Sequence, residues 1–150
     1  MIYLLITIGV FLTDLAIKHF VDRKYARKVR HPRLGGRIIL EKYYNNGAAL
    51  NLLEKKPGLM RLLHSAAIVL VGVFSYFLMR VSGRPLEKTG VALLLGGGLS
   101  NLYDRYTKGH VVDYFHINIG PKRLRRIIFN LSDFCVFIGA LLAVAGSETA

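Results

Sequence analysis

Four long apolar stretches divide the chain, with polar segments between them. The stretches cover roughly residues 2–20, 59–79, 88–103 and 127–145. A helix needs about 20 apolar residues to cross a bilayer, so each stretch is predicted to be a transmembrane helix. None has the heptad spacing of a coiled coil or the polar face of a soluble amphipathic helix. The pattern predicts a mainly α fold, a polytopic membrane protein with four transmembrane helices.

The third stretch is the shortest, and it contains three consecutive glycines, Gly96, Gly97 and Gly98. In water such a run disfavours a helix. Between membrane helices, however, small residues let two backbones approach closely. We therefore predict that this stretch is a helix packed within the bundle.

Two long polar segments and one short turn connect the predicted helices. Residues 21–58 include a patch at 37–44 that favours a β-strand, so a small β-rich extramembrane segment is predicted there. Residues 105–126 form the second polar segment, and residues 80–87 form a turn. The chain shows no internal repeat, and residues 1–150 are treated as a single membrane domain.

The number of predicted membrane crossings places the polar residues at one face of the membrane. With four crossings, the end of the first helix, the end of the third and the start of the fourth share one membrane face. Both long polar segments lie at that face as well. Polar residues that are scattered in the sequence are therefore expected to converge in space, whichever way the protein is oriented.

Composition and charge favour a membrane protein over a soluble domain. The chain has 150 residues and is 53% hydrophobic, yet its formal net charge is +12. Apolar runs with clustered bases are typical of membrane proteins with basic loops. No nucleic-acid recognition motif accompanies the charge, so nucleic acid is not an expected partner. Cys135 is the only cysteine, which excludes an intramolecular disulfide and a cysteine-rich metal site.

Ionisable side chains inside membrane helices are costly, and they mark functional candidates. Asp14 and Lys18 stand late in the first predicted helix, Asp104 ends the third, and Asp133 stands about two turns into the fourth. Asp113 follows Asp104 in the polar segment. Asp14 and Lys18 are spaced i,i+4 and can pair on one side of a helix. A structural ion pair is favoured for these two over a direct catalytic role. The same two residues argue that the first helix is retained and is not a cleaved signal.

The pattern Asn-Leu-x-Asp occurs twice. Its copies are Asn101-Leu102-Tyr103-Asp104 and Asn130-Leu131-Ser132-Asp133. At i,i+3 on a helix, an amide and a carboxyl share a face, and a neutral amide can orient a carboxylate without adding charge. The alternative is that the pairs only cap and join helices. Spacing alone leaves open whether Asp133 pairs with Asp104 or with Asp113. Asp113 could also be a loop carboxylate or a helix N-cap, and Arg105 could hold Asp104 ionised.

Five blocks of the sequence resemble the motifs of the lipoprotein signal peptidase (signal peptidase II) family. The blocks are GGGLSNLYDR at 96–105, GHVVDYF at 109–115, FNLSD at 129–133, Asn45-Asn46-Gly47-Ala48-Ala49, and the first-helix block with Asp14 and Lys18. They occur in order and cover essentially the whole chain. Any single block is a weak signal, whereas five in order are specific.

The resemblance implies an aspartic endopeptidase of the bacterial cytoplasmic membrane whose active site faces outward. Such enzymes remove signal peptides from diacylglyceryl-modified prolipoproteins by cutting before the lipid-bearing Cys. The catalytic pair falls on Asp113 and Asp133, which selects Asp113 as the partner of Asp133. Supporting or substrate-binding roles fall on Asp14, Lys18, Asn45, Gly47, Asn101, Asp104, Arg105 and Asn130. No metal and no cofactor are implied. The expected partners are the prolipoprotein and membrane lipid, and the chain is expected to act as a monomer.

The chain departs from the usual residues of the family at four positions. Ser100 stands where glycine is usual, Gly98 and Ser132 where alanine is usual, and Leu50 where an aromatic residue is common. All four exchanges are small or apolar, and they keep both carboxylates. They bear on substrate fit and on the level of activity rather than on the type of reaction.

Two other functions fit parts of the sequence. His110 and His116 flank Asp113, which makes a metal-dependent hydrolase an alternative, although the histidine spacings match no zinc ligand set. A non-catalytic membrane protein could instead use the basic clusters to bind anionic lipid or lipoprotein. Orientation is also in conflict, because the positive-inside rule places the basic segments in the cytoplasm. We follow the orientation that the family resemblance implies.

Overall fold

The computed structural model describes residues 1–47, 53–122 and 124–148. Within these ranges it contains four α-helices and a 4-stranded sheet. The helices are α1 (Ile2–Lys24), α2 (Pro57–Arg80), α3 (Pro85–Thr107) and α4 (Leu131–Glu148). The strands are β1 (His31–Arg33), β2 (Ile38–Asn45), β3 (Val111–Ile117) and β4 (Ile128–Phe129), and two short 3-10 helices are η1 (Leu34–Gly36) and η3 (Leu124–Arg126). The predicted helical fold with a small β element is confirmed at this level.

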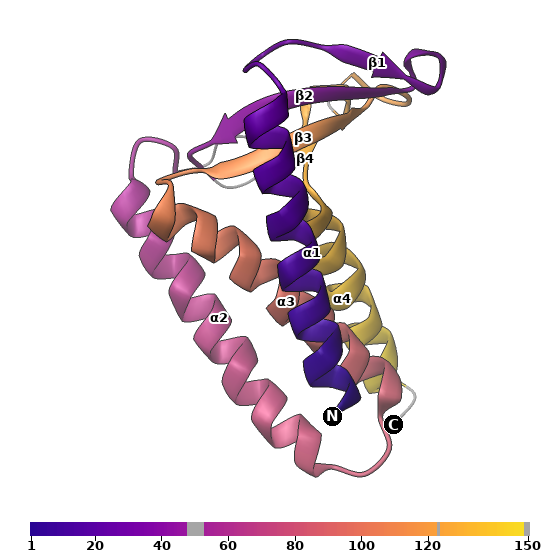
Figure 1. Ribbon diagram of the computed structural model, residues 1–150. Coiled ribbons are helices and arrows are strands. Elements are labelled where there is room, and N and C mark those ends of the chain that lie inside the picture. The colour runs from indigo at the N-terminus through magenta and orange to yellow at the C-terminus, as the bar shows by residue number, and fades with distance from the viewer. Residues whose placement is uncertain (48–52, 123, 149–150) are drawn as a thin grey trace.

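The helices lie side by side, and the sheet runs across one end of them (Figure 1). α3 lies between α2 on one side and α1 and α4 on the other. The start of α1 and the end of α4 lie at the end opposite the sheet. The end of α1, the end of α3 and the start of α4 therefore meet beneath the sheet, where the count of crossings places them.

In the part of the chain that the structure describes, two helices have the length and apolarity of membrane spans. α1 has 23 residues with a hydropathy of 1.8, and α2 has 24 residues with a hydropathy of 2.0. The apolar part of α4, Leu131–Ser147, is shorter. α3 is more polar, and many of its polar side chains are buried against the other helices. It also extends beyond the predicted 88–103 at both ends.

The predicted start of the fourth helix was wrong. Residues 127–145 were expected to be helical, but Ile128 and Phe129 form β4 and pair with β3. The helix begins only at Leu131, because the side chain of Asn130 caps it. Asp133 therefore stands in the first turn of α4, not two turns into it.

The sheet joins both polar segments. Its order is β1-β2-β3-β4, and every pair is antiparallel. β2 confirms the strand expected near 37–44, whereas strands in the second polar segment were not expected. The register pairs Tyr43 with Asp113, after a shift between Leu40 and Tyr43. Asp113 is thus a strand residue, neither a loop carboxylate nor a helix N-cap.

Glycines set the close approach of α3 to its neighbours. A Cβ atom on Gly90 would lie 2.5 Å from the carbonyl oxygen of Gly139 in α4, and a Cβ on Gly139 would lie 2.6 Å from that of Gly90. A Cβ on Gly97 would lie 2.7 Å from the carbonyl oxygen of Ser132, and one on Gly96 would lie 2.7 Å from that of Thr7 in α1. Small residues therefore keep this seam tight, as expected for helices packed in a membrane.

The helix bundle has a polar interior and an apolar exterior. Side chains with an exposure of 0% include Asp14, Lys18, Ser100, Asp104 and Ser132. Large apolar side chains of the outer helices are instead exposed, among them Leu5, Leu70 and Phe137. This arrangement suits a hydrocarbon surrounding, in which polar side chains face the interior of the bundle.

Candidate active site

A cavity of about 730 Å³ opens between the sheet and helices α2, α3 and α4. Its polar lining includes Asn45 from β2, Asp113 from β3, Asn101 from α3 and Asp133 from α4. Its apolar lining comes from α4 and from residues 127–129 before it. The cavity therefore combines a carboxylate centre with an apolar wall.

Asparagine amides hold the two carboxylates that face this cavity. Asn130 Nδ2 donates to Asp113 Oδ1 at 2.7 Å, and Asn45 Nδ2 donates to Asp113 Oδ2 at 3.0 Å. Asn101 Nδ2 donates to Asp133 Oδ1 at 3.1 Å. Asn130 also contacts Asp133 through its backbone, so one residue links the two carboxylates.

Asn130 and Asp133 form a reciprocal helix cap. The backbone N–H of Asn130 donates to Asp133 Oδ2 at 3.0 Å, and the backbone N–H of Asp133 donates to Asn130 Oδ1 at 3.0 Å. This is the hydrogen-bond pattern of a capping box. The second Asn-Leu-x-Asp copy therefore caps α4 and also directs its carboxylate into the cavity.

Asp113 retains a proton more strongly than an ordinary aspartate. Burial and, after it, the neighbouring charge of Asp133 together raise the pKa of Asp113 to about 7. The hydrogen bonds from Asn45 and Asn130 oppose this shift but do not cancel it. Two neighbouring carboxyls that cannot both ionise cheaply hold one proton between them.

Lys18 lies at the centre of a second buried cluster. Its Nζ lies 2.7 Å from Asp14 Oδ2 and 3.4 Å from Asp104 Oδ2. The same Nζ donates to Asn101 Oδ1 at 2.7 Å. The predicted ion pair of Asp14 and Lys18 is present, and Asn101 connects it to the carboxylate of Asp133.

Two departures from the family pattern meet at Asp14. Ser100 Oγ donates to Asp14 Oδ2 at 2.6 Å, and Ser132 Oγ donates to the same oxygen. Tyr114 Oη donates to Asp14 Oδ1 at 3.3 Å and accepts from the backbone N–H of Leu131 at 2.8 Å. The serines and the tyrosine therefore supply hydroxyl donors to a fully buried carboxylate. Sequence reasoning did not assign this role to any of them.

Asp104 and Arg105 do not pair in the way the sequence suggested. Asp104 Oδ1 lies 2.8 Å from Lys108 Nζ, and Asp104 Oδ2 accepts from the backbone N–H of Val112 at 3.2 Å. Arg105 instead donates through Nη2 to the carbonyl oxygen of Gly47 at 2.7 Å. Lysines, not Arg105, form the ion pairs of Asp104. Asn101, in turn, donates to Asp133 on the neighbouring helix and not to Asp104 of its own motif.

Arg105 of α3 and Asn45 at the end of β2 line another wall of the cavity. Arg105 is only 7% exposed, and its Nε and Nη1 have no hydrogen-bond partner among the described residues. Asn45 Oδ1 accepts from the backbone N–H of Gly47 at 3.0 Å, which fixes the direction of the Asn45 amide. Ala48, Ala49 and Leu50 of the same motif lie outside the described residues.

The histidines near Asp113 have other partners. His116 Nε2 lies 2.9 Å from Glu41 Oε2, and the ring of His110 lies 3.9 Å from that of Tyr44. Within residues 1–47, 53–122 and 124–148, no group of three His, Cys, Asp or Glu side chains could hold a metal ion. The cavity wall does include His64 of α2, which sequence reasoning missed. It is the only imidazole or charged side chain between Arg61 and Arg80, and that pattern could have revealed it.

Comparison with known proteins gives one consistent result. A family model described as signal peptidase (SPase) II matches residues 6–147. A lipoprotein signal peptidase of Lactiplantibacillus plantarum is 30% identical over 145 residues, which cover 97% of this chain and 93% of the relative. A lipoprotein signal peptidase of Aquifex aeolicus is 34% identical over 147 residues, with 95% and 83% covered.

Solved structures share the fold. Two structures described as bacterial membrane enzymes superpose with TM-scores of 0.84 and 0.80, at 23% and 24% identity. The matches cover 98% and 95% of this chain and 87% and 90% of the two solved chains. The helices and the sheet are therefore arranged as in known membrane enzymes.

Proposed function

This chain belongs to the signal peptidase II family, and from that premise we propose that it is an intramembrane aspartyl endopeptidase. Its substrates are diacylglyceryl-modified prolipoproteins, and it cuts before the lipid-bearing Cys to release the signal peptide. One observation carries the proposal: Asn130 links the buried carboxylate of Asp113 to the half-buried carboxylate of Asp133, at a cavity with an apolar wall.

The reaction needs a base and an acid, and a pair of aspartates that shares one proton supplies both. The ionised carboxylate takes a proton from water, and the resulting hydroxide attacks the scissile carbonyl carbon. The protonated carboxyl donates to the carbonyl oxygen and stabilises its developing negative charge. The carbonyl then re-forms as the carbon–nitrogen bond breaks, and the carboxyl that took the proton from water gives it to the leaving amine. The elevated pKa of Asp113 supports this division, because it keeps the shared proton in place near neutral pH.

The surrounding residues position the pair and the substrate. Asn45, Asn101 and Asn130 direct the carboxylate oxygens without neutralising them. Lys18 holds Asn101 in place through its 2.7 Å hydrogen bond. The buried donors of Arg105 at Nε and Nη1 are suited to carbonyl oxygens of a bound peptide.

The membrane arrangement forms part of the proposal. All four helices cross the bilayer, α3 inside the bundle with its polar residues turned away from lipid. The sheet and the carboxylate pair lie at the outer face of the cytoplasmic membrane, and the chain acts as a monomer. The polar interior and apolar exterior of the bundle support this arrangement.

The direct test is cleavage of a lipidated precursor, followed by gel shift. Asp113→Asn and Asp133→Asn each remove a proton-transfer group and are expected to lower the rate at least about 10²–10⁴-fold. Both variants should remain folded in the membrane. Glu54→Gln makes the same carboxyl-to-amide change at an exposed position and should cleave normally.

Other outcomes of that experiment separate the alternatives. Full activity in either aspartate variant would end the assignment of the pair. Loss of cleavage in a chelator would point to metal-dependent hydrolysis. A protein that binds the precursor but never cuts it, with function lost only on removal of the basic clusters, would indicate a non-catalytic lipid-binding or lipoprotein-binding role.

A further inference from the structure

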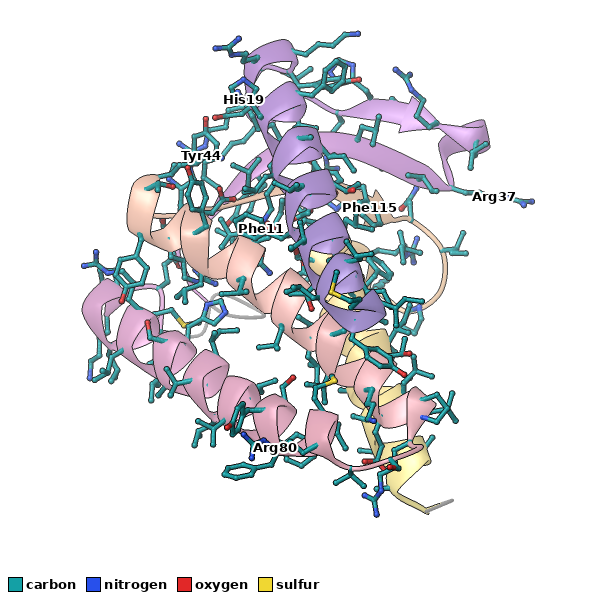
Figure 2. All side chains as sticks on the ribbon, turned by 60° about the horizontal axis from the view of Figure 1, so that its bottom comes forward. Phe11, His19, Arg37, Tyr44, Arg80 and Phe115 are labelled. Carbon is teal, nitrogen blue, oxygen red and sulfur yellow. The ribbon has the colours of Figure 1, made fainter. Side chains whose placement is uncertain are left out.

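The hairpin of β1 and β2 projects past the helices and ends in an apolar residue between two bases. Figure 1 shows both strands reaching beyond α1 at one end of the sheet. Leu34 stands at the tip with an exposure of 73%, and Arg33 and Arg37 flank η1. Arg37 extends away from the helices in Figure 2. The tip therefore presents one leucine and two guanidinium groups to the surroundings.

The segment that follows β3 joins the same surface. The backbone N–H of Asn118 donates to the carbonyl oxygen of Arg37 at 2.8 Å, and Asn118 Nδ2 donates to that of Gly36 at 2.8 Å. The next residue, Ile119, is 54% exposed, and Lys122 and Arg125 are also exposed. We call this set the hairpin surface. Its members are Arg33, Leu34, Arg37, Ile119, Lys122 and Arg125.

The positive charge of the hairpin surface has no counter-charge within these segments. No Asp or Glu stands between Asp22 and Glu41, or between Asp113 and Asp133. Glu41 is buried, and its Oε2 already contacts Arg30 Nε at 2.9 Å and His116 Nε2 at 2.9 Å. The surface is therefore suited to an external anion.

We propose that the hairpin surface binds the anionic headgroups of the leaflet that the sheet faces. Polar headgroups occupy the zone just beyond the hydrocarbon core, and the sheet runs across the helix ends at that level (Figure 1). Lys and Arg at such a surface attract anionic lipid. Leu34 and Ile119 enter the boundary between headgroups and acyl chains, as the apolar residues of interfacial segments do.

A single tryptophan can report on this contact, because the chain contains none. Leu34→Trp is reconstituted in nanodiscs of phosphatidylcholine, alone or mixed with phosphatidylglycerol. In the mixed discs its emission is expected at shorter wavelength, with stronger quenching by brominated acyl chains. The difference should disappear at about 1 M salt, where the screening length falls to about 3 Å. Ile119→Trp gives a second, independent reporter.

Neutralising the two arginines at the hairpin tip measures the electrostatic contribution to lipid binding. Each base near an anionic surface contributes about fivefold in binding. Arg33→Gln with Arg37→Gln, in the Leu34→Trp protein, should therefore raise the phosphatidylglycerol fraction at the midpoint severalfold. Lys55→Gln with Lys56→Gln is the matched control, since these exposed bases precede α2 at the sheet end. The control should leave the midpoint unchanged.

Three results would overturn the proposal. One is equal emission and quenching with and without phosphatidylglycerol, from both reporters. Another is a midpoint that shifts as much in the Lys55→Gln, Lys56→Gln control as in the Arg33→Gln, Arg37→Gln variant. The third is an emission change that depends only on added prolipoprotein, which would make this a substrate surface. Repeating the titration with Asp113→Asn separates this contact from the proposed cleavage, because lipid binding should be retained when cleavage is lost.

Discussion

Among the described residues, three buried aspartates and one half-buried aspartate form two clusters, and the partners of the two clusters differ in kind. In the ammonium cluster, Asp14 and Asp104 contact the charged Nζ of Lys18 at 2.7 and 3.4 Å. In the amide cluster, the hydrogen-bond partners of the two carboxylates are neutral: side-chain amides and the backbone N–H of Asn130. That cluster consists of Asp113, Asp133, Asn45, Asn101 and Asn130. Asn101 touches both clusters, since it accepts from Lys18 and donates to Asp133.

This difference in partners suggests different roles: the ammonium cluster stabilises the fold, and the amide cluster is proposed to carry out the chemistry. The Nζ of Lys18 in α1 contacts Asp14 of its own helix and Asp104 of α3, so the ammonium cluster holds α1 against α3. Amides orient carboxylates but carry no charge, so the amide cluster must keep a proton, as the pKa of about 7 at Asp113 indicates. A proton held near neutral pH is available for transfer. We expect substitutions in the first cluster to act mainly on folding and those in the second mainly on catalysis.

The largest effect is expected from Lys18→Met. It leaves two buried carboxylates without their shared cation, and breaking such an ion pair costs about 3–5 kcal/mol of unfolding free energy. Denaturation of the purified protein in detergent measures the loss. Lys108→Met is the matched control, because Lys108 also contacts Asp104 but is partly exposed. It should cost no more than about 1 kcal/mol, and equal losses from both lysines would contradict the distinction.

Asn130→Ala should reduce catalysis more than stability. The substitution removes a 2.7 Å hydrogen bond to Asp113 and one half of the α4 cap. A hydrogen bond to a charged group contributes about 1.5–3 kcal/mol, so kcat is expected to fall about 10- to 100-fold. Rates of precursor cleavage at saturating substrate measure it. Asn118→Ala, at an exposed asparagine, should leave kcat unchanged, and an equal decrease in that variant would refute the role of Asn130.

Asn45→Ala should move the pH profile of cleavage. In the proposed mechanism the pair works only while it holds its proton, so activity is expected to fall as pH rises through the pKa of Asp113. The hydrogen bond from Asn45 lowers this pKa, and its removal therefore shifts the alkaline limb to higher pH. Profiles of kcat/KM against pH measure the shift. Asn46→Ala, at the exposed neighbour, provides the control, and a limb that moves to lower pH would contradict the assignment.

The smallest effect is expected at the two serines that donate to Asp14. Ser100→Gly and Ser132→Ala each remove one hydroxyl donor and should cost about 1 kcal/mol of unfolding free energy. Because both hydroxyls share one carboxylate oxygen, the double variant should deviate from additivity by at least about 0.5 kcal/mol. Ser147→Ala is the control, because Ser147 lies at the exposed end of α4, far from Asp14. Its change in unfolding free energy should add to that of Ser100→Gly or of Ser132→Ala.

The sequence predicted the features that depend on local pattern. Apolar runs gave the helices, although the start of α4 was misplaced because Asn130 caps it. The i,i+4 spacing of Asp14 and Lys18 gave their ion pair. The motif blocks singled out Asp113 and Asp133, whose side chains both line the cavity.

Features that depend on pairing between distant segments escaped prediction. β3 buries Asp113 and His116 together with apolar neighbours, so no polar–apolar alternation marks it as a strand. The side-chain amide of Asn101 in α3 donates to Asp133 in α4, whereas the i,i+3 spacing rule considers only pairs within one helix. Ser100 and Ser132 meet at Asp14 only because glycines bring α3 and α4 so close.

The glycine seam of α3 and α4 has a mechanical consequence. Gly90 and Gly139 lie backbone to backbone, whereas a Cβ atom on Gly58 or Gly72 of α2 would meet nothing within 4 Å. The close backbone contact of α3 and α4 fixes Asn101 of α3 relative to Asp133 of α4. α2 carries neither Asp113 nor Asp133, and at Gly98 it meets α3 through the flexible end of the Ile68 side chain, so we expect the cavity to widen by movement of α2 before α4 moves.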